Sequence, residues 1–88
     1  MSRPIRLSGR EASVVRNIGF GLGVTGAELQ ALMQMDPESL VDILNTLIEA
    51  GFVETASMRE QTTIADYPAE TFELNPSYVQ DLKAATRR

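Results

Sequence analysis

Apolar residues in the first half of the chain recur at the three- and four-residue spacing of helices that bury one face. The pattern predicts a first helix from Ser8 to about Phe20, a second after Thr25 and a third after Asp36. Their inward stripes comprise Leu7, Val14, Val15, Ile18 and Leu22 in the first helix, Leu29, Leu32 and Met33 in the second, and Leu40, Val41, Leu44, Leu47 and Ile48 in the third.

Signals for helix ends separate these segments. Thr25 and Glu28 have the spacing of a capping box, in which each side chain satisfies a free amide of the first turn. Asp36 followed by Pro37 is a typical start for the third helix, and Gly51 supplies the left-handed residue that ends it. The glycines of residues 19–23 predict that the first helix stops there and that a short extended connection follows.

After residue 51 the pattern of apolar and polar residues becomes typical of strands. Residues 52–55 and 71–74 favour strands, and we expect them to pair antiparallel. The polar segment 58–70 between them is too long for a tight hairpin and is the candidate wing. Asn75 predicts the start of a last helix, about 77–86, whose apolar stripe packs either on the domain or on a second copy in a homodimer. That stripe consists of Tyr78, Val79 and Leu82.

Composition narrows the classes of function. The chain has 88 residues, of which 43% are hydrophobic, as expected of one domain spanning 1–88 with a core at about 8–75. It lacks cysteine and histidine, which disfavours disulfides, metal sites and acid–base catalysis. No segment has the length of a membrane span. We therefore expect a cytoplasmic protein that is not an enzyme and has no cofactor.

The order helix, helix, helix, strand, wing, strand resembles the winged-helix superfamily, including regulators of the MarR type. The resemblance covers about residues 8–75 and is carried by residues 25–29 and by residues 44–53, which leave the third helix. It implies an α+β, mainly helical, winged helix-turn-helix fold with a three-helix core, a two-stranded antiparallel wing and a C-terminal helix. In DNA-binding members, the third helix enters the major groove and wing bases touch phosphate.

The charge of the third helix disfavours recognition of DNA bases by this helix. The net charge is -4, and residues 23–50 contain acidic residues but no basic residue. The outward face of the third helix would present carboxylates where phosphate contacts need cations. It is either a docking surface for a basic protein partner, with a nearby apolar anchor, or a solvated helix side. The docking candidates are Glu38, Asp42, Ile43, Asn45, Thr46 and Glu49, with Met35 and Met58 as further apolar anchors.

A DNA-binding transcriptional regulator is the alternative. It would use basic residues outside the third helix, mainly the N-terminal arginines and the wing, joined by the C-terminal bases if the chain ends meet. Asn45 and Thr46 could address base edges but lack nearby phosphate anchors. The nucleic-acid candidates are Arg6, Arg10, Arg16 and Arg59, with Arg3, Arg87 and Arg88 as further members of the basic set.

Residues 21–26 match the glycine spacing of a dinucleotide-binding loop. A predicted helix, not a strand, precedes them, and a chain of this length cannot house a doubly wound sheet. A flexible joint between helices is the better interpretation. The preferred hypothesis is a winged-helix adaptor that acts by protein contact through its acidic third helix.

Overall fold

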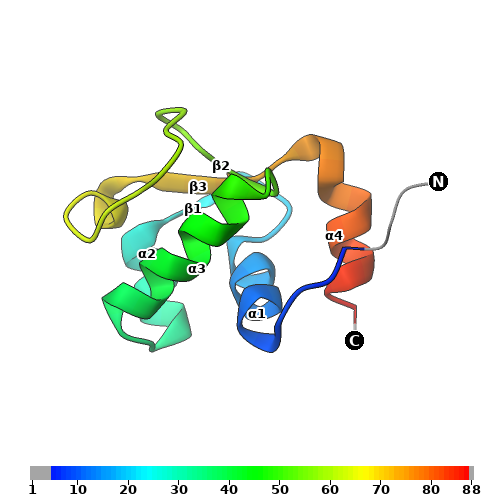
Figure 1. Ribbon diagram of the computed structural model, residues 1–88, viewed down its shortest axis with the longest axis horizontal. Coiled ribbons are helices and arrows are strands. Elements are labelled where there is room, and N and C mark those ends of the chain that lie inside the picture. Colours follow the sequence, from blue (N-terminus) through cyan, green and yellow to red (C-terminus); the bar gives the residue numbers. More distant parts are fainter. Residues whose placement is uncertain (1–4, 88) are drawn as a thin grey trace.

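The fold combines helices with a small sheet of short strands (Figure 1). The computed structural model describes residues 5–87. In chain order the elements are α1 (Gly9–Ile18), β1 (Val24–Thr25), α2 (Gly26–Met33), α3 (Pro37–Glu49), β2 (Val53–Thr55), the 3-10 helix η1 (Tyr67–Ala69), β3 (Thr71–Leu74), the 3-10 helix η2 (Pro76–Tyr78) and α4 (Val79–Ala85).

The first helix begins where the sequence predicts and ends earlier than predicted. Ser8 caps α1, and a reciprocal bond that the sequence analysis missed completes a capping box: the Ser8 amide donates to Glu11 Oε1 at 2.8 Å. Helix α1 ends at Ile18 and not at about Phe20. Gly19 follows with a φ of +77°, a left-handed conformation that terminates the helix.

The two helices of the helix-turn-helix have the predicted caps. The hydroxyl of Thr25 accepts from the amide of Glu28 at 3.1 Å, and the amide of Thr25 donates to the Glu28 carboxylate at 2.9 Å. Asp36 caps α3, with Pro37 in its first turn. Gly51, with a φ of +87°, turns the chain toward β2, so the predicted end of the third helix is confirmed.

The sheet has three strands, in the order β1-β3-β2. The predicted antiparallel pairing of residues 52–55 with 71–74 is confirmed, since Val53 lies opposite Leu74. A third strand joins the predicted pair: the extended connection expected before α2 is β1, which pairs with the other edge of β3, with Val24 opposite Phe72. A strand of two residues has no alternating pattern of its own, so only its hydrogen-bonded neighbour reveals it.

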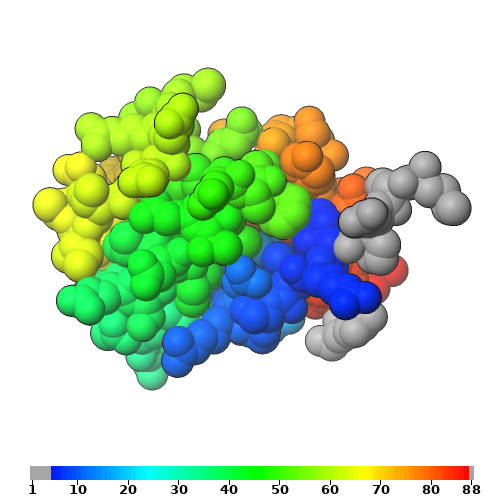
Figure 2. All heavy atoms as spheres, in the orientation of Figure 1, coloured from blue at the N-terminus to red at the C-terminus, as the bar shows by residue number. Residues whose placement is uncertain are grey.

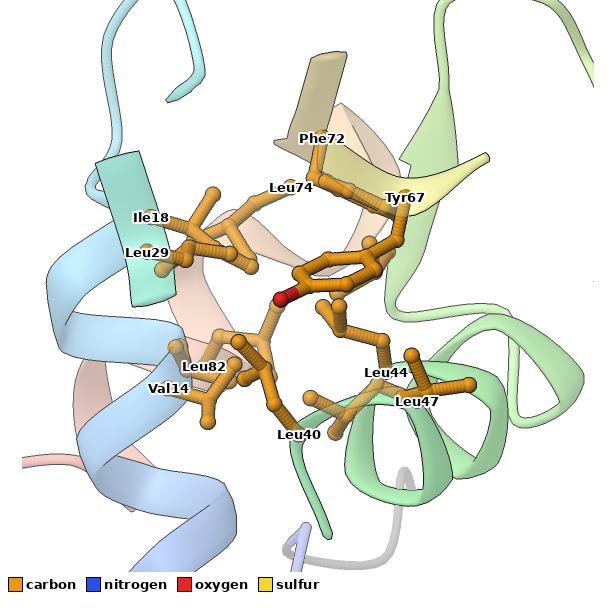
Figure 3. Packing of buried hydrophobic residues seen from close by; sticks show 13 residues of the cluster. Val14, Ile18, Leu29, Leu40, Leu44, Leu47, Tyr67, Phe72, Leu74 and Leu82 are labelled. Carbon is orange, nitrogen blue, oxygen red and sulfur yellow. The ribbon is translucent and has the colours of Figure 1, made fainter. Parts of the chain in front are cut away.

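One hydrophobic cluster joins the helices to the inner side of the sheet (Figure 3). Phe72 and Leu74 point from β3 into the space lined by side chains of α1, α2 and α3. Leu82 is fully buried, so the stripe of the last helix packs on the domain itself through this residue. The cluster comprises Val14, Val15, Ile18, Leu29, Leu40, Val41, Leu44, Leu47, Val53, Tyr67, Phe72, Leu74 and Leu82.

Three residues of the predicted apolar stripes are exposed, among them Tyr78 of the last stripe, at 36%. The other two belong to the first and second helices. Leu22, assigned to the stripe of the first helix, lies beyond the end of α1 and is 96% exposed. Leu32, assigned to the stripe of the second helix, is 58% exposed. Helix α2 has only eight residues and buries Leu29 in the core, while Met33 is half-buried. The predicted stripes were therefore too wide at these two positions.

Candidate protein and nucleic-acid interfaces

The outward face of α3 carries the acidic residues that the sequence analysis selected. Glu38, Asp42, Thr46 and Glu49 are exposed, and three of these four are carboxylates. Ile43 is half-buried beside them. Residues three, four and seven positions apart share one side of a helix, so Asp42, Thr46 and Glu49 form a single strip along α3.

The start of α3 concentrates further negative charge. The hydroxyl and the amide of Ser39 donate to the two carboxylate oxygens of Asp36, at 2.8 and 3.0 Å. These bonds lower the pKa of the Asp36 carboxyl, the hydroxyl more than the amide, and the charge of Arg10 contributes a smaller lowering. Asp36 therefore stays ionised at the helix N-terminus, where negative charge is favourable.

A hollow between the start of α1 and the outward face of α3 is a feature that sequence reasoning missed. Figure 2 shows these two segments side by side on the face in view. The hollow measures about 310 Å³ and is open to solvent. We call it the α3 hollow; it is lined by Ser8, Arg10, Glu11, Ser39, Asp42, Ile43 and Thr46. The available sequence signal was the capping box at Ser8, which fixes where α1 begins and so identifies one wall of the hollow.

Asn45 is bonded to the segment between β2 and β3, which we call the wing loop (residues 56–70). Its side-chain Nδ2 donates to the carbonyl of Thr62 at 3.0 Å, and its Oδ1 accepts from the amide of Thr62 at 2.7 Å. Thr62 itself is buried. Both halves of the Asn45 amide are therefore engaged within the protein, and this residue is not an open group on the face of α3.

The end of the wing loop packs against α2. The hydroxyl of Tyr67 donates to Gln30 Oε1 at 2.9 Å, and Gln30 Nε2 donates to the carbonyl of Met35 in the turn between α2 and α3. Gly26 lies directly beneath Tyr67 and donates its amide to the carbonyl of Glu70 at 3.0 Å. The predicted wing thus lies against both helices of the helix-turn-helix.

Glu70 links the two ends of the wing loop. Its carboxylate accepts from the hydroxyl of Ser57, from the amide of Ser57 at 3.3 Å and from the amide of Thr71 at 3.2 Å. These bonds, the Ser57 hydroxyl first, lower the pKa of the Glu70 carboxyl below its ordinary value of 4.5. The ionised form of Glu70 therefore stabilises the folded protein.

Replacement of Glu70 by glutamine is expected to lower stability by about 1 kcal/mol at neutral pH, a modest cost because solvent screens this partly exposed carboxylate. A carboxyl whose pKa is lowered by folding contributes its full stabilisation above 4.5 and loses it as the pH falls through the lowered value. Thermal unfolding at about pH 7 and about pH 3 measures this. The unfolding temperatures of the wild type and the variant should converge at acidic pH, and a difference that stays constant with pH would contradict the prediction. Glu73→Gln, on the exposed side of β3, is the control.

Arg59, the basic residue of the predicted wing, is paired with an acid of the same loop. Its Nη1 lies 2.9 Å from Asp66 Oδ2, and both side chains are about half exposed. An exposed pair of this kind contributes little to stability. It nevertheless neutralises the charge that a wing contact with phosphate would require.

Basic residues from both ends of the chain gather at α4. Arg16 donates from Nη1 to the carbonyl of Thr86 at 3.3 Å, which ties α1 to the end of α4. Lys83 lies with its Nζ 5.4 Å from the centre of the Phe20 ring. Arg87 is exposed just beyond the end of α4.

The structure does not bring the four nucleic-acid candidates together. Arg10 lines the α3 hollow among carboxylates, whereas Arg16 is bonded to α4. Arg59 belongs to the wing loop, and Arg6 is exposed in the segment before α1. Arg3 and Arg88 lie outside the described residues. The basic residues near α4, which are Arg16, Lys83 and Arg87, therefore form a surface to which Arg59 of the wing loop does not belong.

Other kinds of site find no support in the described part of the chain. Among residues 5–87, no three histidine, cysteine or acidic side chains are grouped so that they could hold a metal ion. Within the same residues, no helix has the length and apolar character to cross a membrane. The glycine-spaced segment 21–26 leads into β1 and α2. The space beside Gly26, which a bound pyrophosphate would need, is occupied by Tyr67.

Comparison with known proteins identifies the fold. No family model and no curated protein matches the chain. A multiple antibiotic-resistance repressor (MarR) from Listeria monocytogenes superposes with a TM-score of 0.73 at 17% identity, over 92% of this chain and 52% of its own. A MarR family transcription regulator superposes with a TM-score of 0.67 at 20% identity, over 92% of this chain and 50% of its own.

The chain spans about half the length of these two regulators. In the order of its elements, α2 and α3 form the helix-turn-helix, and β2, the wing loop and β3 form the wing. The predicted resemblance is therefore confirmed at the level of architecture. The chain has a winged-helix fold of the MarR-like type.

Proposed function

We infer that this chain is a winged-helix regulatory module that acts through protein contact at the outward face of α3 and carries out no catalysis. The observation that carries the proposal is the chemistry of α3. The helix that reads bases in DNA-binding winged helices here exposes Glu38, Asp42 and Glu49. Its Asn45, a residue type suited to base recognition, is fully bonded to Thr62.

The α3 hollow supports docking of a protein because it combines charge with an apolar contact. Electrostatic complementarity selects and orients a partner but contributes limited affinity, so a docking face needs a desolvated anchor point. Ile43 supplies apolar surface within the hollow, and the carboxylate-bearing Asp42 is also part of its lining. The proposed partner segment is therefore basic and presents an aliphatic side chain.

A short peptide of alternating lysine and leucine is a suitable probe for this site. Backbone amide shifts of the labelled protein should change at residues 38–49 and at the start of α1 when the peptide is added. Asp42→Arg should weaken peptide binding by roughly tenfold, or about 1.4 kcal/mol, because it replaces an anion in the lining of the hollow by a cation. The unfolding temperature should change little, since Asp42 is exposed.

Glu73→Arg is the matched control because it changes the net charge equally on the exposed side of β3, away from α3. It should leave peptide affinity nearly unchanged. Equal losses in the two variants would mean that the peptide responds only to overall charge, and that result would overturn the proposed site. Shifts spread evenly over all acidic residues would have the same meaning.

DNA binding is the second candidate function, and it fits the structural neighbours at least as well. The bond from Arg16 to Thr86 favours it because it creates a basic surface with Lys83 and Arg87 nearby. Binding of random-sequence duplex DNA should then be strong at low salt and fall steeply at moderate salt. Amide shifts confined to α1 and α4 would support this candidate, whereas no binding at low salt would exclude this basic surface.

A further inference from the structure

A single residue attaches the first part of the wing loop to α3. Of residues 56–66, which we call the strap, Thr62 is the one that is buried. Within the described chain, Asn45 is also the one α-helical residue that hydrogen-bonds to residues 60–66. Figure 2 shows the strap beside α3 on the face in view. The strap is therefore held to this helix at one point, the contact of Thr62 with Asn45.

The two bonds at this point engage only the backbone of Thr62. Asn45 Nδ2 donates to its carbonyl at 3.0 Å, and Asn45 Oδ1 accepts from its amide at 2.7 Å. Facing residues of antiparallel strands exchange the same pair of bonds, because an extended residue directs its N–H and C=O to one side. Asn45 therefore binds a feature that any extended residue except proline possesses, whatever its side chain.

The side chain of Thr62 is poorly suited to its position. Thr62 is 3% exposed, and its hydroxyl oxygen is buried without a hydrogen-bond partner. A buried hydroxyl of this kind costs at least as much free energy as a typical hydrogen bond contributes. The strap is therefore bound to α3 less tightly than its two backbone bonds alone would allow. Valine has nearly the same shape as threonine and would leave no hydroxyl unpaired.

The site around Asn45 also carries negative charge. Asp42 stands three residues before Asn45 and Glu49 four residues after it, so all three lie on the same side of α3. Glu38, two turns before Asn45, continues this side, and the three carboxylate residues are exposed. An extended segment bound to Asn45 would pass these carboxylates, which would attract cations on that segment.

We propose that the strap is an autoinhibitory segment that occupies a peptide-binding site at Asn45, and that an extended basic segment of a partner protein displaces it. In the displaced state, Asn45 bonds to the N–H and C=O of one partner residue instead of those of Thr62. That residue has an aliphatic side chain such as valine, and the lysines beside it face Asp42 and Glu49. This inference rests on the proposed docking role of α3 and adds how access to that face is controlled.

Variants of residue 62 test whether the strap competes with a partner. The apparent affinity for a partner falls with the fraction of molecules whose site is open. Thr62→Val should favour the closed strap, slow hydrogen exchange of the residue-62 amide by roughly tenfold and weaken peptide binding by the same factor. Thr62→Gly, which removes the buried side chain, should open the strap and tighten peptide binding. Circular dichroism confirms that both variants are folded.

Two peptides of equal length and charge serve as probes. One alternates lysine with valine, and the other alternates lysine with threonine. The lysine–valine peptide should bind roughly tenfold more tightly, since it leaves no hydroxyl unpaired in the site. Its binding should remove the protection of the Thr62 amide and shift the amide signals of residues 42–49 and 60–64. Thr86→Val, at the end of α4 and remote from the strap in Figure 1, is the matched control and should leave peptide affinity unchanged.

The outcomes separate this inference from the proposed function. Peptide affinity that is equal in Thr62→Val and the wild type would overturn the inference, as would a bound peptide that leaves the Thr62 amide protected. Equal affinity for the two peptides would also overturn it. Shifts confined to the α3 hollow would then leave α3 as a docking face that the strap does not control. If neither the wild type nor Thr62→Gly binds either peptide at α3, both proposals are overturned.

Discussion

Replacement of Gly26 by alanine is expected to lower the free energy of unfolding by about 3 kcal/mol. A Cβ at this position would lie 2.6 Å from the carbonyl carbon of Tyr67 and 2.6 Å from its ring atom Cδ2. Both the backbone and the buried ring of Tyr67 would have to move. The hydrogen bond from the Gly26 amide to Glu70 would be strained by the same movement.

Gly9→Ala is the control for this prediction. Gly9 is the first residue of α1, and a Cβ there meets no atom within 4 Å. Alanine at this position should be neutral or slightly stabilising, by up to about 0.5 kcal/mol, because it loses less backbone entropy on folding than glycine. Urea unfolding monitored by circular dichroism measures both variants. A Gly26→Ala variant as stable as the wild type would contradict the close packing of the wing loop on α2.

Gly26 also explains why a nucleotide-binding pattern appears in this sequence. Glycines in such a loop serve close approach of the backbone to a pyrophosphate. Here Gly26 allows close approach of a different group, the backbone of Tyr67. Gly23 similarly approaches the carbonyl of Phe72 in β3. The shared physical requirement is space for a neighbouring atom, and the sequence alone does not tell which neighbour fills it.

Local signals made the helix-turn-helix predictable. The caps at Thr25 and Asp36 and the turn at Gly51 depend on residues within four positions of one another, so their chemistry can be judged from sequence. The same holds for the alternation in β3, where Phe72 and Leu74 are buried and Glu73 is exposed. These features fixed the order of the elements and hence the resemblance to winged helices.

Contacts between distant residues account for what the sequence did not predict. Strand β1 exists because Val24 lies opposite Phe72, far along the chain. The exposure of Leu22 follows from where the glycines end α1, and helical spacing alone misplaced it. The α3 hollow likewise requires α1 and α3 to be adjacent. An outward acidic face could be recognised from residue types, but its hollow could not.

The wing shows the same limit most clearly. Its length and polarity identified it as the connection between β2 and β3. Nothing in the local sequence indicated that Tyr67 would be buried against Gln30 or that Thr62 would bond to Asn45. Those contacts join positions 17 and 37 residues apart. These contacts pack the predicted wing on the helices.

Asn45→Ala is expected to lower the free energy of unfolding by about 2 kcal/mol. The substitution removes both hydrogen bonds to Thr62 and leaves the buried amide and carbonyl of that residue without their partners. An unsatisfied buried polar group costs more than the net value of the bond it made. Asn45→Asp should also destabilise, because it keeps the acceptor for the Thr62 amide but opposes an oxygen to the Thr62 carbonyl.

Amide hydrogen exchange at Thr62 locates the effect. Its protection should fall in Asn45→Ala more than that of amides within α3, because the wing loop loses its bond to the helix before the helix itself opens. Thr46→Ala, on the exposed side of the same helix, should leave Thr62 protected. Unchanged protection in Asn45→Ala would mean that Tyr67 and Glu70 suffice to hold the loop. If protection does fall, Asn45 is a structural residue while the wing loop is bound, and until that loop is displaced the chemistry that α3 offers to a partner is that of its carboxylates and the hollow beside them.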